Sequence, residues 1–148
     1  MPTTAPSIDL AALATQVRLS VMRLSRKLRK ENSGADITPT LLAALSTIER
    51  HGPMTVGDLA THEQVQKPTV TRILADLTER SLVERTPDPL DGRISWLQVS
   101  AEGRQLLQRI RRRHDAYLAK RLRRLNPDEL DTLERAAEIL ERLTEGEQ

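Results

Sequence analysis

The sequence predicts a mainly α-helical fold, in which a winged helix-turn-helix is flanked by long helices at both ends of the chain. Three observations support this prediction. Two short helical patterns joined by a tight turn lie between Thr55 and Leu77, a strand-turn-strand pattern continues to Val99, and apolar residues at helical spacing occupy both flanks. The predicted parts are 1–37 (N-terminal helix), 38–100 (winged helix-turn-helix) and 101–148 (C-terminal helices).

Composition excludes several classes of function. The chain has no cysteine and no phenylalanine, and it has one tryptophan and one tyrosine. Without thiols there is no disulfide, thiolate zinc site or cysteine redox sensor. Without aromatic platforms, RNA-recognition and single-strand-binding folds are disfavoured. The N-terminus lacks the features of a signal peptide and no apolar run approaches bilayer length, so we expect a soluble, cytoplasmic protein.

The net charge of +2 is small but unevenly distributed. Lys and Arg outnumber Asp and Glu by six to three over 1–37 and by nine to two over 101–126. Acidic residues outnumber basic ones by eight to six over 38–100 and by eight to two over 127–148. The net charge of residues 38–100 therefore does not indicate nucleic-acid binding. Any such indication must come from the positions of a few individual residues.

The N-terminal helix is predicted to begin at Ile8, with Ser7 as its cap, and to end near Asn32-Ser33-Gly34. Its apolar residues alternate in spacings of four and three, which is typical of a helix that packs on other helices. They are Leu10, Ala14, Val17, Val21, Leu24 and Leu28. Its six basic residues fit a solvated face best, and a site for an acidic small molecule is the alternative.

Start and stop signals outline the next two helices. Thr38 and Pro39 are a cap followed by a first-turn proline, and a His-Gly-Pro sequence at residues 51–53 ends that helix. Thr55 with Asp58 three residues later predicts a capping box. A turn at residues 62–65 then leads to the second helix of the helix-turn-helix, which has proline in its first turn.

That second helix separates an apolar face from a polar one. Its apolar residues repeat at helical spacing and are expected to face inward: Val70, Ile73, Leu74 and Leu77. The outer face then holds Gln66, Lys67, Thr69, Thr71 and Arg72, with Asp76 as a further candidate. Arg and Gln can contact bases bidentately, while Thr and Lys reach phosphate or a thymine methyl, so the face suits a major-groove reader. Taken alone, this helix fits an ordinary solvated surface better than a DNA reader.

The hairpin that follows favours DNA binding. Strand-like residues 82–86 and 94–99 flank a turn-forming loop. Asp91 lies two residues before Arg93, close enough to hold the guanidinium in one pose at the tip. An ordered Arg on a narrow protrusion suits insertion into a minor groove, although a salt bridge that only stabilises the turn fits as well. Trp96 is expected to pack under the hairpin rather than to stack on bases.

Two helices are predicted after the hairpin. Ser100 caps the first, which extends to about residue 125, and Asn126, Pro127 and Glu129 are a start signature for the second. The second keeps one apolar face, with Leu130, Leu133, Ala137, Leu140 and Leu143. We interpret the basic blocks 109–114 and 120–124 as solvated parts of the first helix rather than as DNA contacts. The acidic last helix is a plausible partner for the basic helices, within one chain or across two.

The motif DPLDGRISWLQVSAEG, residues 88–103, resembles the wing of the MarR family of bacterial winged-helix transcription factors. In that family D-P-x-D-x-R is followed by alternating apolar residues and then Leu-Thr-x-x-Gly. Leu59-Ala60 and KPTVTRILADL, residues 67–77, support the resemblance, which covers essentially the whole chain. Ser81 stands where the family usually has Gly, which predicts a strained turn. Gly92 replaces a frequent basic residue, which predicts either a looser wing tip or weaker phosphate contact. Val99-Ser100 replaces Leu-Thr, a mild change that keeps the helix cap.

The resemblance implies a homodimeric repressor with two recognition helices and two wings on one pseudo-palindromic site in double-stranded DNA. It also implies release by a small, acidic or aromatic effector bound between the dimer helices and the DNA-binding domain. The predicted DNA-binding residues are Gln66, Lys67, Pro68, Thr69, Thr71, Arg72, Asp91 and Arg93. No cofactor, metal site, catalytic residue or membrane partner is predicted.

Two other classes of function are open to the sequence. The first is a helical protein-interaction adaptor that dimerises without binding DNA. The second, an enzyme, is poorly supported: His51, His62 and His114 are scattered along the chain, no metal-ligand spacing appears, and no glycine-rich loop could cradle a phosphate.

Overall fold

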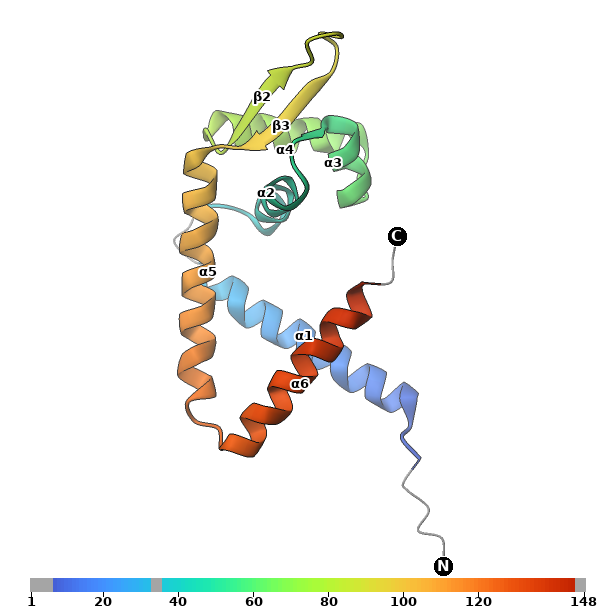
Figure 1. Ribbon diagram of the computed structural model, residues 1–148, viewed down its shortest axis with the longest axis vertical. Helices are drawn as coiled ribbons and strands as arrows, with labels where there is room; N and C mark the ends of the chain where they lie inside the picture. Colours follow the sequence, from blue (N-terminus) through green and yellow to red (C-terminus); the bar gives the residue numbers. More distant parts are fainter. Residues whose placement is uncertain (1–6, 33–35, 146–148) are drawn as a thin grey trace, which may run out of the picture.

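The computed structural model describes residues 7–32 and 36–145, and within them the chain forms six helices and one three-stranded sheet (Figure 1). The elements in order are α1 (Leu10–Glu31), α2 (Pro39–His51), β1 (Met54–Thr55), α3 (Val56–Glu63), α4 (Lys67–Glu79), β2 (Val83–Pro87), β3 (Ser95–Val99), α5 (Ala101–Leu122) and α6 (Pro127–Thr144). Helices dominate, which confirms the mainly α prediction. The winged helix-turn-helix, α2 to β3, occupies one end of the molecule (Figure 1).

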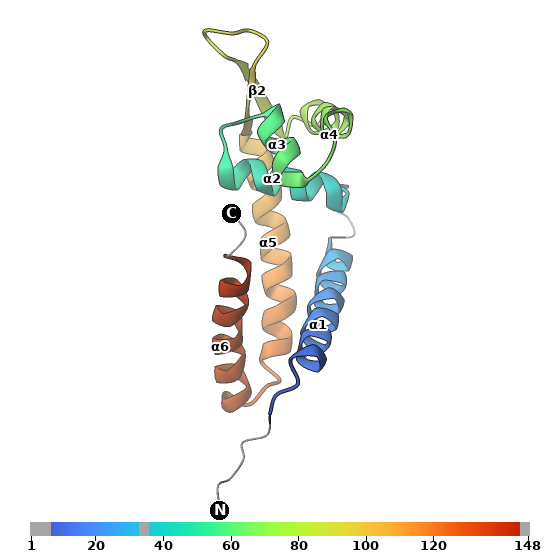
Figure 2. The same ribbon diagram turned by 90° about the vertical axis from the view of Figure 1, so that its right-hand side faces the viewer.

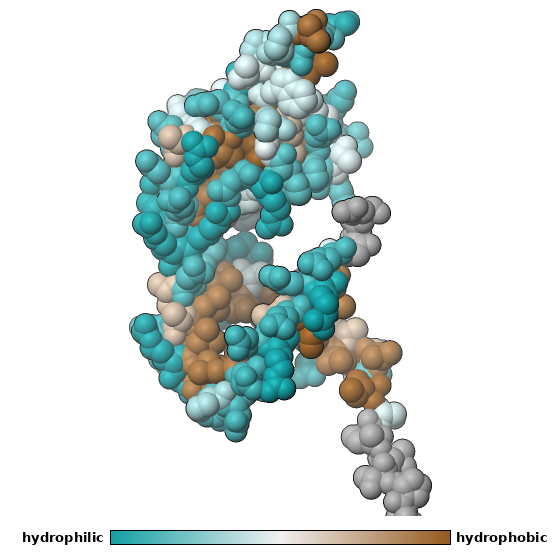
Figure 3. All heavy atoms as spheres, in the orientation of Figure 1, coloured by the Kyte–Doolittle hydropathy of each residue, from teal (hydrophilic) through white to brown (hydrophobic). Residues whose placement is uncertain are grey.

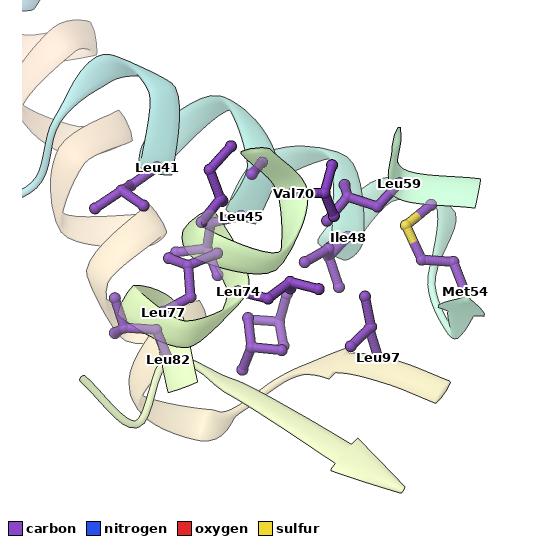
Figure 4. Close-up of a cluster of buried hydrophobic side chains, with 14 of the residues drawn as sticks. Leu41, Leu45, Ile48, Met54, Leu59, Val70, Leu74, Leu77, Leu82 and Leu97 are labelled. Carbon is purple, nitrogen blue, oxygen red and sulfur yellow. The ribbon is translucent and has the colours of Figure 1, made fainter. Parts of the chain in front are cut away.

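One hydrophobic core holds the winged helix-turn-helix together. It forms where α2, α3 and α4 meet the sheet and the start of α5 (Figure 4). All four residues predicted to face inward from α4 are buried in it, namely Val70, Ile73, Leu74 and Leu77. Its other fully buried side chains include Leu45, Ile48, Leu59, Leu97 and Leu107. Burying one such side chain contributes about 1.5–3 kcal/mol, so this core fixes which face of α4 points outward.

The sheet has the strand order β1-β3-β2, and both strand pairs are antiparallel. In the hairpin, Val83 lies opposite Val99 and Pro87 lies opposite Ser95, so each strand begins one residue later than predicted. The sequence does not predict β1, because two residues are too few to show the alternation by which a strand is recognised.

The two ends of α1 differ in how well the sequence predicts them. The predicted start, Ile8 with Ser7 as its cap, is wrong. The helix begins at Leu10, and Asp9 accepts hydrogen bonds from the first-turn N–H groups. A carboxylate at this position also interacts favourably with the positive end of the helix dipole. The helix ends near the predicted position, with Asn32 as its C-terminal cap in a right-handed rather than a left-handed conformation (φ −81°), whereas Ser33 and Gly34 lie outside the described residues.

The other predicted caps are present. Thr38 caps α2, Ser100 caps α5, and complete capping boxes start α3 and α6. Beside the cap of α5, a Cβ added to Gly103 would lie 2.3 Å from the carbonyl oxygen of Leu82. The close approach of α5 to the hairpin therefore requires glycine at this position, which is the glycine of the MarR-like motif.

The turn between α4 and β2 is strained, as the departure from the MarR pattern predicts. Ser81 has φ of 59°, a left-handed conformation that costs an L-residue about 1–2 kcal/mol. Its carbonyl accepts a hydrogen bond of 2.6 Å from the Ser100 hydroxyl, and its N–H donates to the carbonyl of Thr78 at 3.0 Å. These two bonds hold the residue in that conformation.

The flanking helices α1, α5 and α6 are packed less completely. α5 leads away from the sheet, and α1 packs against α5. α6 folds back from the far end of α5 at an angle (Figures 1 and 2). α1 and α6 cross in Figure 1 but lie on opposite sides of α5 in Figure 2. Neither has a buried residue within the described chain, despite the apolar spacing of both. None of the described helices combines the length and the apolar character needed to cross a membrane.

Candidate nucleic-acid interface

α4 and the wing, the hairpin of residues 83–99, lie at the same end of the molecule (Figures 1 and 2). Because its apolar residues are buried, α4 turns its polar side outward. The predicted contact residues that are exposed there are Gln66, Lys67, Pro68, Thr71 and Arg72. Thr69 and Asp76 are half-buried at the edges of this face. The face is therefore the one that the sequence predicts, with two of its members less accessible.

The N-terminus of α4 differs from those of the other described helices. Gln66 precedes it without a side-chain cap, and its first turn has no acidic residue, whereas α1, α2, α3, α5 and α6 all begin with a side-chain cap. The positive end of the helix dipole is therefore not neutralised, and it lies beside the exposed ammonium group of Lys67. Such a terminus attracts a phosphate group.

Two polar side chains of α4 are engaged within the helix, while its cations are not. The Thr71 hydroxyl donates to the carbonyl of Lys67 at 2.9 Å, which leaves its methyl group and its two oxygen lone pairs for a partner. Asp76 accepts from Nε of Arg80 at 3.3 Å. Among the described residues, Lys67 and Arg72 form no ion pair. Both charges are available to DNA.

Asp88 organises the wing. Its Oδ1 accepts the backbone N–H of Leu90 at 2.8 Å and that of Asp91 at 3.0 Å, and its Oδ2 accepts the indole Nε1–H of Trp96 at 2.9 Å. The indole bond and then the two backbone bonds lower the pKa of Asp88, so the carboxylate is ionised at neutral pH. Trp96 is half-buried, as expected for a packing residue, and it also ties β3 to the start of the loop.

Asp91 holds Arg93 at the tip, as predicted. Oδ1 of Asp91 accepts the backbone N–H and Nε of Arg93, both at 3.0 Å, and Oδ2 accepts Nη2 at 3.2 Å. The guanidinium bond, followed by the backbone bond, lowers the pKa of Asp91. The Arg93 side chain is nevertheless 91% exposed. The result is a guanidinium that is oriented without being buried.

Sequence reasoning missed two features of this region. The role of Asp88 was signalled by an Asp-Pro pair at the start of a loop, where Asp commonly bonds to backbone N–H groups. The second feature is a contact between two of the histidines that the sequence shows as scattered: the rings of His51 and His62 stack with their centroids 4.5 Å apart.

Within residues 7–32 and 36–145, no group of three or more potential ligands could hold a metal ion.

Known proteins share this arrangement. The family model described as MarR family matches residues 37–95, which contain the helix-turn-helix and most of the wing. An uncharacterized HTH-type transcriptional regulator of Mycobacterium bovis, Mb0904, is 42% identical over 130 residues, which are 88% of this chain and 91% of that protein. The chain belongs to the MarR family. This MarR protein is therefore a transcriptional regulator with a DNA-binding helix-turn-helix, and the prediction that it is not an enzyme is confirmed.

Solved structures share the fold of the MarR protein. A putative transcriptional regulator from Pseudomonas aeruginosa matches with a TM-score of 0.84 and 28% identity, over 96% of this chain and 100% of that one. A MepR mutant of Staphylococcus aureus, bound to an oligodeoxyribonucleotide, matches in fold with a TM-score of 0.70 and 21% identity, over 88% and 97% of the two chains. The predicted winged-helix fold is confirmed.

Proposed function

We propose that this MarR protein is a homodimeric repressor that binds a pseudo-palindromic duplex with α4 in the major groove and Arg93 in the minor groove. The observation that carries the proposal is that two unpaired cations on α4, Lys67 and Arg72, share one end of the molecule with an oriented wing arginine. Arg on a recognition helix reads base edges, and the negative potential of the minor groove attracts Arg93. Gln66, Pro68, Thr69 and Thr71 would complete the α4 surface, and Asp91 would act by orienting Arg93.

Repression is supported by a relative. MdtR of Bacillus subtilis, which is named as a transcriptional repressor, is 27% identical to this chain over 123 residues, covering 80% of this chain and 79% of MdtR. A dimer that covers a promoter would block transcription by occupying the DNA, and this needs no contact with other proteins.

The dimer is supported by uncovered apolar surface on the flanking helices. An open groove of about 770 Å³ lies between α5 and α6, where Figure 3 shows a broad apolar area. The leucines that line it are Leu24, Leu118, Leu122, Leu130, Leu133 and Leu140. Contiguous apolar surface of this kind marks an interaction site, and an α6 that packs on nothing is not stable in water. Two copies related by a twofold axis would cover this groove on each other.

Charge supports a second copy as the partner. Four carboxylates of α6 and one at its C-terminal cap recur at spacings of three and four, so they form one row along the helix: Asp131, Glu134, Glu138, Glu141 and, at the cap, Glu145. α1 carries six basic residues and, apart from Glu31, no acidic one. Among the described residues no cation of α1 pairs with a carboxylate. Asp131 already pairs with Arg135 within α6, so the other four carboxylates of the row are the ones that would pair with α1 of a second copy.

An effector site is supported by a hollow of about 390 Å³ between α1 and α2. Arg29 and Asn32 are its polar described lining, and Ile37, Pro39 and Leu42 are apolar. Oδ1 of Asn32 is buried and has no hydrogen-bond partner among residues 7–32 and 36–145. An aromatic hydroxy acid would satisfy all three features, with its carboxylate on Arg29, its hydroxyl on Asn32 and its ring on the apolar wall. Such an acid should weaken DNA binding by the wild type and not by Arg29→Gln, which titration calorimetry and gel shifts would measure.

The DNA-binding proposal is tested by gel shift with a duplex selected from a random pool. Arg72→Ala and Arg93→Ala should each cost about 1–3 kcal/mol, and Arg72→Ala should also relax the preference at one base position. Arg135→Ala, an exposed arginine on α6, is the matched control and should bind normally. Unchanged affinity in both test variants, or binding that is insensitive to salt, would instead indicate a helical adaptor.

A further inference from the structure

Leu90 at the tip of the wing is an exposed aliphatic residue that neither the core nor the proposed dimer explains. It is 98% exposed, and Figure 3 shows apolar atoms at this tip. The other large apolar side chains of high exposure, apart from Ile94 at 39%, lie before or within α1, α5 and α6, where a second copy would cover them. The wing points away from those helices (Figure 1). Leu90 is thus a fully exposed apolar side chain at the proposed DNA-binding end of the molecule, which neither the core nor a second copy would cover.

The loop holds Leu90 in this position. The Asp88 carboxylate fixes its backbone N–H at 2.8 Å, and the loop is closed at its base by hydrogen bonds between Asp88 N–H and the Ile94 carbonyl (2.8 Å) and between Ile94 N–H and the Asp91 carbonyl (3.0 Å). A leucine on a slack loop could fold back onto the hairpin and lose its exposure. Here three hydrogen bonds oppose that movement, so the side chain stays presented to solvent.

We propose that Leu90 enters the minor groove of DNA beside Arg93 and packs against the deoxyribose rings that form its walls. The inference rests on the proposed DNA-binding function. Apolar side chains inserted into a minor groove are a known means of contact, and Leu is among the residues used. Gly92 lies between Asp91 and Arg93 with nothing within 4 Å of an added Cβ, so no bulk at that position separates the leucine from the arginine. The tip thus offers one aliphatic and one cationic contact to the same groove.

The aliphatic contact differs in kind from the one that the family frequently has beside the wing arginine, where this chain has Gly92 in place of a basic residue. A cation at this position would add a phosphate contact that depends on salt. The contact of Leu90 depends on the removal of apolar surface from water and carries no charge. The two contacts at the tip are therefore separable: Arg93 sets part of the salt dependence of binding, whereas Leu90 contributes affinity that salt leaves unchanged.

The first experiment measures fluorescence anisotropy of a duplex that the wild-type protein selects from a random pool, over a series of salt concentrations. Leu90→Asn keeps the number and branching of the side-chain heavy atoms but is polar, and it should weaken binding about five- to tenfold with an unchanged salt slope. Leu90→Met stays apolar and should bind within about twofold of wild type. Arg93→Ala should weaken binding and lower the slope by about one unit. The emission of Trp96, the only tryptophan, should be the same in all free proteins, which shows an intact wing.

The outcomes separate this inference from the proposed function. If the wild type selects no duplex, the DNA-binding proposal fails and this inference fails with it. If the wild type binds and Leu90→Asn binds equally well, only the inference is overturned. Equal losses in Leu90→Asn and Leu90→Met would also overturn it, because the apolar character of the side chain would then be irrelevant.

A second experiment identifies the groove. Replacing adenine by 2,6-diaminopurine beneath the wing adds an amino group to the minor groove, as a G·C pair does, and leaves the major-groove edge of the base in place. This change should weaken binding by the wild type more than binding by Leu90→Asn. An equal effect on both proteins would mean that Leu90 lies outside the minor groove and would overturn the inference.

Discussion

The winged helix-turn-helix and the flanking helices α1 and α6 have similar sequence patterns but very different packing. All buried aliphatic side chains of the described chain lie between Leu41 and Ile110, and α1 and α6 contribute none. The apolar stripe of α4 meets α2, α3 and the sheet within one chain, whereas the stripe of α6 lines an open groove. Apolar periodicity shows that a helix needs a partner. It does not show whether that partner lies in the same chain.

The largest expected effect tests the self-contained core. Leu74 is fully buried, so Leu74→Ala should lower the free energy of unfolding by about 2–5 kcal/mol through lost burial and a residual cavity. Urea denaturation followed by circular dichroism measures this change. Leu90→Ala is the matched control at an exposed site and should alter stability by less than about 0.5 kcal/mol. Similar losses in the two variants would mean that burial in the single chain does not determine stability.

The second effect tests the open groove. Leu133 lines it at 46% exposure, and Leu133→Glu would place a carboxylate in the proposed interface. Because burying an unpaired charge is costly, the dimer dissociation constant should rise at least about tenfold in sedimentation experiments. Trp96 emission should not change, since the winged helix-turn-helix keeps its own core. Arg135→Glu, at an exposed position outside the groove lining, should remain dimeric, and a monomer in both variants would contradict the role of the groove.

The third effect concerns the wing, which hydrogen bonds rather than a core hold in shape. The lowered pKa of Asp88 means that its ionised form favours the folded wing above the ordinary carboxyl pKa, and that this stability is lost as pH falls through the lowered value. Trp96 emission should therefore stay constant from about pH 8 to pH 5 and change only below about pH 4. Asp88→Asn cannot accept the indole and both backbone bonds equally, so its emission should differ from wild type at neutral pH. A transition of the wild type near neutral pH would contradict this account.

The sequence predicts best what local chemistry decides. The caps at Thr38, Ser100 and Asn126 and the buried stripe of α4 depend on residues within one or two turns of each other, and the structure has all of them. The Asp91–Arg93 pair is predictable for the same reason. Family resemblance supplied what these local rules could not, namely that a helix-turn-helix with a formally acidic composition binds DNA.

The features that the sequence does not predict depend on contacts over a longer range. The Asp88 bond to Trp96 spans the whole wing loop, β1 is defined only by its pairing with β3, and the stack of His51 on His62 joins two helices. The start of α1 is a different kind of error. Ser7 and Asp9 are both good caps, and the sequence offers no local reason that selects between them.

The smallest expected effect tests whether the two regions are energetically separate. Ser81→Gly should relieve the left-handed strain and raise the free energy of unfolding by about 0.5–1 kcal/mol, after the greater freedom of glycine in the unfolded chain is subtracted. Ser95→Gly, in the extended backbone of β3, is the matched control and should be destabilising, because there is no strain to relieve. The dissociation constant of the Ser81→Gly dimer should equal that of wild type, since the hydrogen bonds of Ser81 go to Thr78 and Ser100, which lie outside α1 and α6. If the dimer dissociation constant changed together with the unfolding midpoint, the winged helix-turn-helix and the dimer helices would unfold as one cooperative unit. The two regions would then differ in packing, as the buried core and the open groove show, but their stabilities would be coupled.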